Sequence, residues 1–278
     1  MGSSECEPQA VLTIRSGAVG RIHLNRPERY NAFNEDMIDG VREAALSLNA
    51  DPEIRAIVLS SEGKFFCAGA DIGYMRKAAG YSREENIADA HRLSSMYEAL
   101  EKSSKPLIAR VQGPTFGGGV GLAAVSDFVF VGPDASFALS EVKLGIQPAV
   151  IGPYVVRRVG VPRARGLFGT AWRVGARDAV GIGLADFFCT DLDELDRKIN
   201  STLKSALSCG PSAVQRSREI PDEVWGIAPS EMVAPMAALS ADARASDEGR
   251  EGLSAFLEKR SAAFVREPNP ISFSEPTN

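Results

Sequence analysis

Two segments of the chain place small residues between an apolar run and the start of a helix-like pattern. Residues 66–71 read Phe-Cys-Ala-Gly-Ala-Asp, and residues 116–121 read Phe-Gly-Gly-Gly-Val-Gly. Small side chains let a ligand approach the backbone closely, and the first N–H groups of a helix are unpaired and favour negative charge. Two such N–H groups aimed at one point would form an oxyanion hole, which stabilises a developing negative charge. Two ordinary tight turns are the alternative interpretation.

Carboxylates are the groups that remain for proton transfer. The chain has two histidines, His23 and His91, and four cysteines without C-x-x-C spacing, which disfavours multi-histidine metal sites, zinc ribbons and redox dithiols. The sequence contains no P-loop, G-x-G-x-x-G or G-x-S-x-G pattern. Glu141 precedes an apolar stretch, so burial is expected to raise its pKa and to let it exchange a proton near neutral pH. A surface glutamate at a strand end is the alternative for Glu141.

Short β-like runs alternate with helical patterns in the first half of the chain. Strands are expected over residues 11–14, 19–24, 55–60, 107–111, 127–131 and 136–139. A helix over 35–48 has Asn34 as its N-cap, and a second helix over 83–102 begins with a capping box of Ser82 and Glu85. After about residue 149 helical patterns dominate, ending with one over 228–264.

This order of elements predicts an α/β core followed by a helical region. The expected divisions are a flexible N-terminus over residues 1–9, a core over 10–200, a C-terminal helical region over 201–265 and a frayed tail over 266–278.

The composition indicates a soluble globular protein. Apolar residues make up 44% and charged residues 24% of the 278 positions. A net charge of −5 disfavours general nucleic-acid binding. No run of 18 apolar residues and no targeting segment is found in the sequence, so the expected compartment is the cytoplasm, with no membrane partner.

Several motifs in order resemble the crotonase (enoyl-CoA hydratase/isomerase) superfamily over residues 10–265. They are Leu24-Asn25-Arg26-Pro27 with Asn31-Ala32, the 66–71 loop, the triple glycine with Asp127, residues 140–146 and residues 251–260. The resemblance implies a crotonase-like ββα superhelix core with a C-terminal α-helical trimerisation region. It also implies an acyl-CoA substrate, a homotrimer or dimer of trimers, and neither a metal nor a cofactor beyond the CoA of the substrate.

The resemblance also assigns roles to individual residues. The N–H groups of Ala70 and Gly118 would hold the thioester oxygen, and Glu141 would be the acid and base. Residues assigned to the substrate are Ala68, Gly69, Asp71, Ile72, Tyr74, Gly117, Gly121 and Pro148. Residues assigned to the CoA portion are Arg29 and Ala32, together with Phe256 and Lys259 from a neighbouring subunit.

One departure from the family pattern leaves the reaction open. Ordinary hydratases of the family use two glutamates, and Gly121 stands where the first would be. Residues 116–122 and 139–151 are most similar to methylglutaconyl-CoA and isohexenylglutaconyl-CoA hydratases, although Tyr74, Gln147 and Gly152 differ from them. We therefore predict a hydratase of a branched enoyl-CoA, with or without a second carboxylate.

Three alternatives remain at this point. A one-glutamate isomerase or a decarboxylase of the same superfamily would use the same site, and a CoA-binding scaffold would have no turnover. A second substrate carboxylate would need a cation, for which Arg76, Lys77, Arg110 and Lys143 are candidates.

Overall fold

The structure, a computed structural model, describes residues 9–273. Within that range the main sheet has six strands in the order β1-β2-β3-β4-β6-β9. β1 and β2 are antiparallel, and the other neighbouring pairs are parallel. The strands are β1 (Val11–Ser16), β2 (Val19–Leu24), β3 (Ala56–Ser61), β4 (Leu107–Val111), β6 (Phe128–Val131) and β9 (Phe187–Phe188). A second sheet has the order β5-β7-β8, formed by β5 (Pro114–Phe116), β7 (Ser136–Ala138) and β8 (Val174–Gly175).

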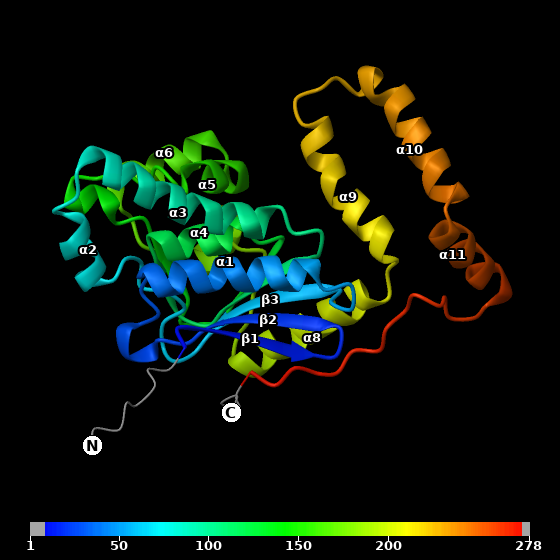
Figure 1. The fold of residues 1–278 in the computed structure, drawn as a ribbon, viewed down its shortest axis with the longest axis horizontal. Coiled ribbons are helices and arrows are strands. Elements are labelled where there is room, and N and C mark those ends of the chain that lie inside the picture. Colours follow the sequence, from blue (N-terminus) through cyan, green and yellow to red (C-terminus); the bar gives the residue numbers. More distant parts are fainter. Residues whose placement is uncertain (1–8, 274–278) are drawn as a thin grey trace.

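Helices lie on both sides of the main sheet (Figure 1). Those of the core are α1 (Glu35–Ala50), α2 (Ile72–Ala78), α3 (Arg83–Glu101), α4 (Gly118–Val125), α5 (Gly152–Val159), α6 (Val161–Thr170), α7 (Ala176–Gly181) and α8 (Leu192–Leu207). The predicted caps are confirmed: the Asn34 side chain accepts from Met37 N–H, and Ser82 and Glu85 form the capping box of α3. Each cap satisfies N–H groups that lack an acceptor within the helix.

Alternate residues of the parallel strands face two separate apolar layers. On β3, Ile57 and Leu59 belong to the layer formed with α1, α3 and α4. Ala56 and Val58 belong to the opposite layer, which α8 completes. Every residue of β3 is buried, as expected for a parallel strand covered on both faces. This explains why the strands read as nearly continuous apolar runs.

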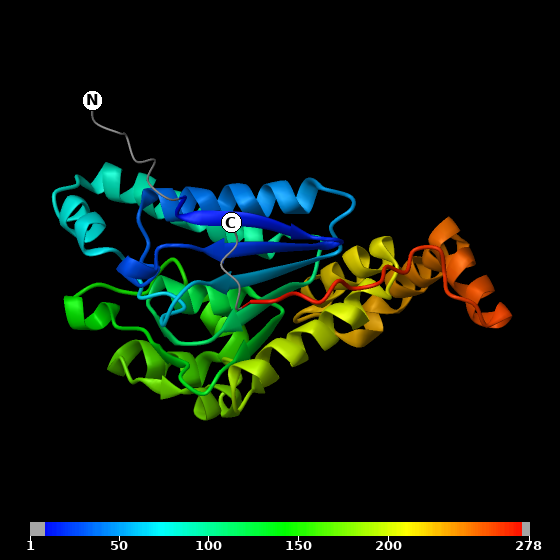
Figure 2. The same ribbon diagram turned by 90° about the horizontal axis from the view of Figure 1, so that it is seen from below.

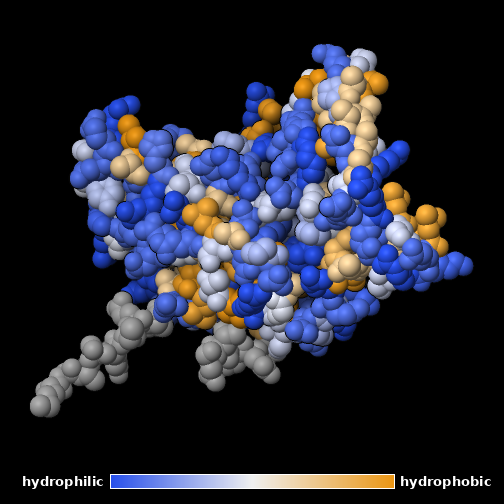
Figure 3. Space-filling model, turned by 45° about the vertical axis from the view of Figure 1, so that its right-hand side comes forward, coloured by the Kyte–Doolittle hydropathy of each residue, from blue (hydrophilic) through white to orange (hydrophobic). Residues whose placement is uncertain are grey.

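The last helices form an arm that projects from the core (Figure 1 and Figure 2). They are α9 (Pro211–Val224), α10 (Val233–Ala245) and α11 (Asp247–Glu258). Trp225, Phe256 and Leu257 are 82%, 80% and 78% exposed, and apolar side chains are visible on the arm in the space-filling view (Figure 3). Ala255 is the one buried residue described for these three helices. A single chain therefore leaves the apolar side chains of the arm without a covering partner.

The predicted helix over 228–264 is wrong in its extent. It is interrupted at Ser246, whose extended backbone ends α10 and whose hydroxyl accepts from Gly249 N–H to cap α11. The predicted boundary at residue 200 falls inside α8, which packs on the core through Leu195, Ile199 and Leu203. The chain leaves the core only after α8 ends at Leu207.

The tail predicted to fray from residue 266 is held in place as far as it is described. The Arg266 N–H donates to the Leu207 carbonyl. Asn200 exchanges two hydrogen bonds with the backbone of Ile271, which is buried. Because these bonds satisfy the tail's polar groups against α8, residues 266–273 run along the core. Residues 1–8 and 274–278, which carry the rest of the predicted flexible ends, lie outside the described residues.

Backbone pairing brings the two glycine-rich segments side by side. Cys67 and Thr115 form a parallel bridge. The Phe66 N–H donates to the Pro114 carbonyl at 3.1 Å, and the Phe116 N–H donates to the Cys67 carbonyl at 2.8 Å. The approach is close at Gly113, where a Cβ atom would lie 1.9 Å from the Lys64 carbonyl oxygen. Glycine at this position is therefore required for the pairing.

We expect Gly113→Ala to lower the free energy of unfolding by about 3 kcal/mol, because the Lys64 backbone must move to admit the methyl group. Chemical denaturation measures this change. Gly181→Ala is the matched control: Gly181 lies in α7 with no atom within 4 Å of an added Cβ. Its expected change is a gain of at most about 1 kcal/mol. Equal midpoints for the two variants would contradict the requirement at Gly113.

Candidate active site

A cavity of about 570 Å³ lies where the two glycine-rich segments meet α2, α3 and the 140–151 segment. Most of its wall is apolar or backbone. The lining residues are Phe33, Ile38, Ala68, Gly69, Ala70, Tyr74, Met75, Asn86, Asp89, Ala90, Leu93, Gly117, Gly118, Ser140, Glu141, Leu144, Ile146, Gln147, Pro148, Ala149, Val150 and Ile151. The cavity thus joins residues separated by more than 100 positions in the sequence.

The N–H group of Ala70 faces this cavity because of how its neighbours pair. The Phe33 N–H donates to the Gly69 carbonyl at 2.7 Å, and the Asp71 N–H donates to the Phe33 carbonyl at 2.8 Å. Successive N–H groups of an extended chain point to opposite sides. The Ala70 N–H therefore points away from Phe33, on the side of the cavity that Ala70 lines.

The second free N–H group belongs to Gly118, the first residue of α4. An N–H group in the first turn of a helix has no acceptor within that helix. Gly117 makes the preceding turn with φ +48°, a conformation that favours glycine. The Gly117 N–H donates to the Ala138 carbonyl at 3.0 Å, which ties this turn to β7. Ala70 and Gly118 thus present two N–H groups to one cavity, as an oxyanion hole requires.

Glu141 lines the same cavity and begins a 3-10 helix (Glu141–Leu144). Its Oε1 atom would be 3.3 Å from a Cβ atom at Gly117. Its Oε2 atom is buried and has no hydrogen-bond partner among residues 9–273. Burial raises the pKa of Glu141, and a backbone hydrogen bond partly opposes that increase. The carboxyl group is therefore poised to hold a proton closer to neutral pH than an exposed glutamate would.

The residues predicted to contact substrate divide into two groups. Ala68, Gly69, Tyr74, Gly117 and Pro148 line the cavity together with Ala70 and Gly118.

Asp71, Ile72 and Gly121 are absent from the cavity wall, and their contact with substrate stays a prediction. The Asp71 side chain caps α2 by accepting from the Gly73 and Tyr74 N–H groups. Ile72 begins α2 and is 69% exposed. Gly121 is buried inside α4. The family resemblance suggested these residues, and none of the three lines this cavity.

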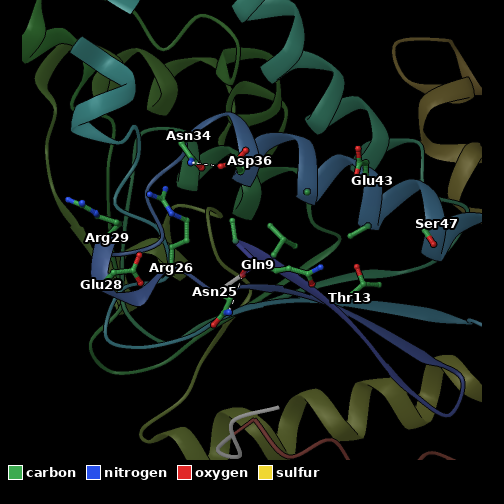
Figure 4. A pocket seen from close by; sticks show the side chains of 14 residues that line it. Gln9, Thr13, Asn25, Arg26, Glu28, Arg29, Asn34, Asp36, Glu43 and Ser47 are labelled. Carbon is green, nitrogen blue, oxygen red and sulfur yellow. Dashed lines mark hydrogen bonds between the residues drawn. The ribbon is translucent and has the colours of Figure 1, made fainter. Parts of the chain in front are cut away.

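The residues predicted to bind the CoA portion also lie outside this cavity. Arg29 lines a separate polar groove of about 930 Å³ between α1, β1 and the 25–29 segment (Figure 4). Ala32 is buried, and its carbonyl accepts from Arg26. Phe256 belongs to α11 and Lys259 is the residue that ends it, so both lie on the arm, at the opposite end of the molecule from α2 (Figure 1).

None of the four candidate cations lines the cavity. Arg110 lies under the other face of the sheet and pairs with Asp196 at 2.6 Å. Lys77 pairs with Glu35. The charged residues of the wall are Glu141 and Asp89, and both are acidic.

Other candidate groups have structural explanations. Cys67 is fully buried, and burial raises the pKa of its thiol to about 12, so it is not activated as a nucleophile. His23 Nδ1 lies 2.9 Å from Ser60 Oγ, and both residues are buried. Across residues 9–273 no group of three or more histidine, cysteine or acidic side chains could hold a metal ion. No described helix is long and apolar enough to cross a membrane.

The sequence interpretation missed two contributors to the site. Asp89 lines the cavity and accepts a hydrogen bond from the Tyr74 hydroxyl. Tyr97 lies next to Gly118 and donates to the Gly118 carbonyl. The glycines at positions 118 and 121, which share one face of α4, were the available signal that a large side chain packs there.

Comparison with known proteins places this geometry in a family. The family model described as enoyl-CoA hydratase/isomerase matches residues 15–267. The chain belongs to the enoyl-CoA hydratase/isomerase family. The predicted crotonase-like α/β core with a helical C-terminal region is therefore confirmed as its fold.

Individual members of the enoyl-CoA hydratase/isomerase family are similar over nearly the whole chain. A crotonyl-CoA hydratase from Syntrophomonas wolfei is 32% identical over 246 residues, which are 88% of this chain and 93% of that protein. A mitochondrial enoyl-CoA hydratase from Pongo abelii is 30% identical over 262 residues, 90% of this chain and 84% of that protein. The crystal structure of an enoyl-CoA hydratase from Shewanella pealeana has a TM-score of 0.88 at 35% identity, covering 91% of this chain and 95% of that one.

We expect Glu141→Gln to lower kcat about 10²- to 10⁴-fold, because the amide cannot exchange a proton. The stability effect has a defined sign. Burial raises the pKa of Glu141 in the folded protein. The stabilisation that Glu141 contributes is therefore fully present below its pKa in the unfolded chain, about 4.3, and is lost as the pH rises through its pKa in the folded protein. The unfolding free energy of the wild type, relative to Glu141→Gln, should therefore fall as pH rises from about 4.

Denaturation at several pH values measures this difference. Glu84→Gln is the matched control, because Glu84 is exposed in the first turn of α3, and it should change neither kcat nor the pH dependence. Wild-type turnover by Glu141→Gln, or a stability difference independent of pH, would contradict the assignment.

Proposed function

We propose that this protein adds water to, or removes it from, a 2-enoyl-CoA thioester, with Glu141 as the acid and base. The observation that supports this most strongly is the placement of two free backbone N–H groups and one buried carboxyl group around one cavity. Backbone donors suit a thioester oxygen that becomes an enolate oxygen, because they need no reorganisation as the charge develops. The relatives named as hydratases support the same reaction class.

The reaction can be written with one carboxyl group. The thioester oxygen accepts hydrogen bonds from the Ala70 and Gly118 N–H groups. The Glu141 carboxylate takes a proton from water as the hydroxide oxygen bonds to C3, and the C2–C3 π electrons move onto the thioester oxygen. The enolate then collapses, and C2 takes the proton from Glu141. One water is added across the double bond, and Glu141 returns to its starting ionisation state.

A second reaction also fits the site. Because Gly121 provides no second carboxylate, Glu141 could instead remove a proton from C2 of a 3-enoyl-CoA and return it to C4. This isomerisation passes through a dienolate, whose oxygen would be held by the same two N–H groups, and it requires no bound water. The two reactions differ in whether a water is incorporated.

The charges of the cavity favour an uncharged acyl group. A second substrate carboxylate would lie among Glu141 and Asp89, with no lysine or arginine in the wall to pair with it. Burying an unpaired charge beside like charges is unfavourable. Ile38, Leu93 and Ile146 provide apolar surface for a branched chain. We therefore favour a branched, uncharged enoyl-CoA over a methylglutaconyl-type substrate.

The arm supports a proposal about assembly. Its exposed apolar side chains, including Phe256 and Leu257, need a cover that one chain does not supply. We propose a homotrimer, alone or as a dimer of trimers, in which Phe256 and Lys259 of one subunit reach the CoA of its neighbour. Arg29 and Ala32 would lie along the same CoA. Sedimentation analysis of the purified protein measures the number of subunits.

We expect an uncharged, 3-branched 2-enoyl-CoA to gain the mass of one water, with a higher kcat/KM than methylglutaconyl-CoA. Mass spectrometry of a panel that also contains a linear crotonyl thioester and a 3-enoyl-CoA separates the possible reactions. Asp89→Asn removes one acidic wall charge and should improve kcat/KM for methylglutaconyl-CoA more than for the uncharged thioester.

Four outcomes would contradict all or part of the proposal. Double-bond migration without mass gain would establish the isomerase, and loss of carbon dioxide would establish a decarboxylase. Tight CoA binding without turnover of any thioester would indicate a scaffold. A preference for methylglutaconyl-CoA would overturn the inference from the wall charges alone.

A further inference from the structure

Tyr97 is a wholly buried tyrosine directly behind the oxyanion hole. It lies on α3, its side chain has no exposed surface, and its hydroxyl donates to the Gly118 carbonyl at 2.7 Å. Burial raises the pKa of Tyr97 well above its usual value, so the hydroxyl remains a donor throughout the neutral range. The bond joins a rigid, 19-residue helix to the first residue of α4.

The ring of Tyr97 also occupies space along the first turn of α4. A Cβ atom at Gly118 would lie 3.1 Å from the Tyr97 hydroxyl oxygen and 2.6 Å from the Phe33 ring. A Cβ atom at Gly121 would lie 2.8 Å from the Tyr97 ring and 2.5 Å from Ile151 Cγ2. Positions 118 and 121 share one helix face. Tyr97 and Ile151 together thus leave no room for a side chain at the position where the family pattern has its first glutamate.

We propose that Tyr97 is the positioning residue of the oxyanion hole and that its ring, together with Ile151, fills the space over Gly121, so that α4 supplies no carboxylate to the site. The effect of Tyr97 on catalysis, which is the catalytic part of this proposal, rests on the proposed function. The contacts of Tyr97 with Gly118 and Gly121 do not depend on which reaction the site performs. The hydroxyl holds the Gly118 carbonyl in place. Because the carbonyl carbon and the amide nitrogen of Gly118 are bonded to the same Cα atom, the hydroxyl also limits the orientation of the Gly118 N–H group. Because donors of an oxyanion hole act through their orientation, a looser Gly118 would stabilise the enolate less.

The first experiment compares Tyr97→Phe with Tyr154→Phe. Tyr154 lies on α5 with its ring centroid 5.5 Å from that of Tyr97, it does not line the cavity, and its hydroxyl donates no hydrogen bond to any described residue. We expect Tyr97→Phe to lower kcat about tenfold with KM changed less than twofold. It should also reduce the near-ultraviolet enolate absorbance of a bound 3-ketoacyl-CoA. Tyr154→Phe should match the wild type in both measurements.

Amide hydrogen exchange over residues 117–121 provides a readout that does not depend on catalysis. It should be faster in Tyr97→Phe than in the wild type and in Tyr154→Phe. Unchanged exchange would overturn the proposal whatever the kinetics show. Faster exchange with unaltered kcat and enolate absorbance would overturn the positioning role. A wild type that binds the 3-ketoacyl-CoA without enolate absorbance would overturn the proposed function, and with it the catalytic part of this inference.

A double-mutant cycle tests whether Tyr97 excludes a side chain at Gly121. Gly121→Ala should destabilise the wild type, because the added Cβ atom meets the Tyr97 ring. The same change should cost less in a Tyr97→Ala background, where the ring is absent. Denaturation midpoints give both costs, and all four proteins are compared with CD spectra to confirm the fold. Equal costs in the two backgrounds would overturn the exclusion.

Discussion

The backbone pairing between residues 66–67 and 114–116 is the interaction on which the site depends. It aligns a loop that follows β3 with a strand that follows β4, although about 50 residues separate them in the chain. Backbone hydrogen bonds define positions more narrowly than side-chain contacts, because the peptide unit is planar and has no rotamers. The pairing brings the Ala70 N–H group and the N-terminus of α4 to one cavity, and the close contact at Gly113 is the steric condition for it.

Around that pairing, the charges of the site are few and belong to partly buried side chains. The cavity wall contributes two acidic side chains, and Glu141 has an oxygen without a hydrogen-bond partner among residues 9–273. A buried carboxylate without a partner is unfavourable. Glu141 therefore lowers the stability of the fold, while its carboxyl group stays available to a substrate. Among residues 9–273, the hydrogen-bond partner of the buried Tyr97 hydroxyl is the Gly118 carbonyl. The Tyr97 ring thus lies against Gly121, where the family pattern has its first glutamate, and the carboxyl groups of the wall are those of Glu141 and Asp89.

The C-terminal third combines an anchored part and an unpartnered part. α8 completes the apolar layer under the main sheet, and the backbone after residue 265 returns along it through Asn200 and Ile271. Between these two anchors, the arm extends away from the core with exposed aromatic and leucine side chains (Figure 2). Because both ends of the arm are attached to the core, its direction is fixed, while its apolar surface stays exposed. This geometry suits contact with another subunit.

The sequence by itself determined the features that depend on neighbouring residues. Asn34 and Ser82 mark helix starts because capping is a bond between residues three positions apart. The apolar strands, the two glycine segments and the family follow from local pattern and motif order. Only the tertiary structure decided which groups share the cavity: it excluded Asp71, Ile72 and Gly121, added Asp89, and placed Tyr97 against α4. These outcomes depend on where side chains from separate elements point, and that direction is set by packing between elements, which one-dimensional spacing does not contain.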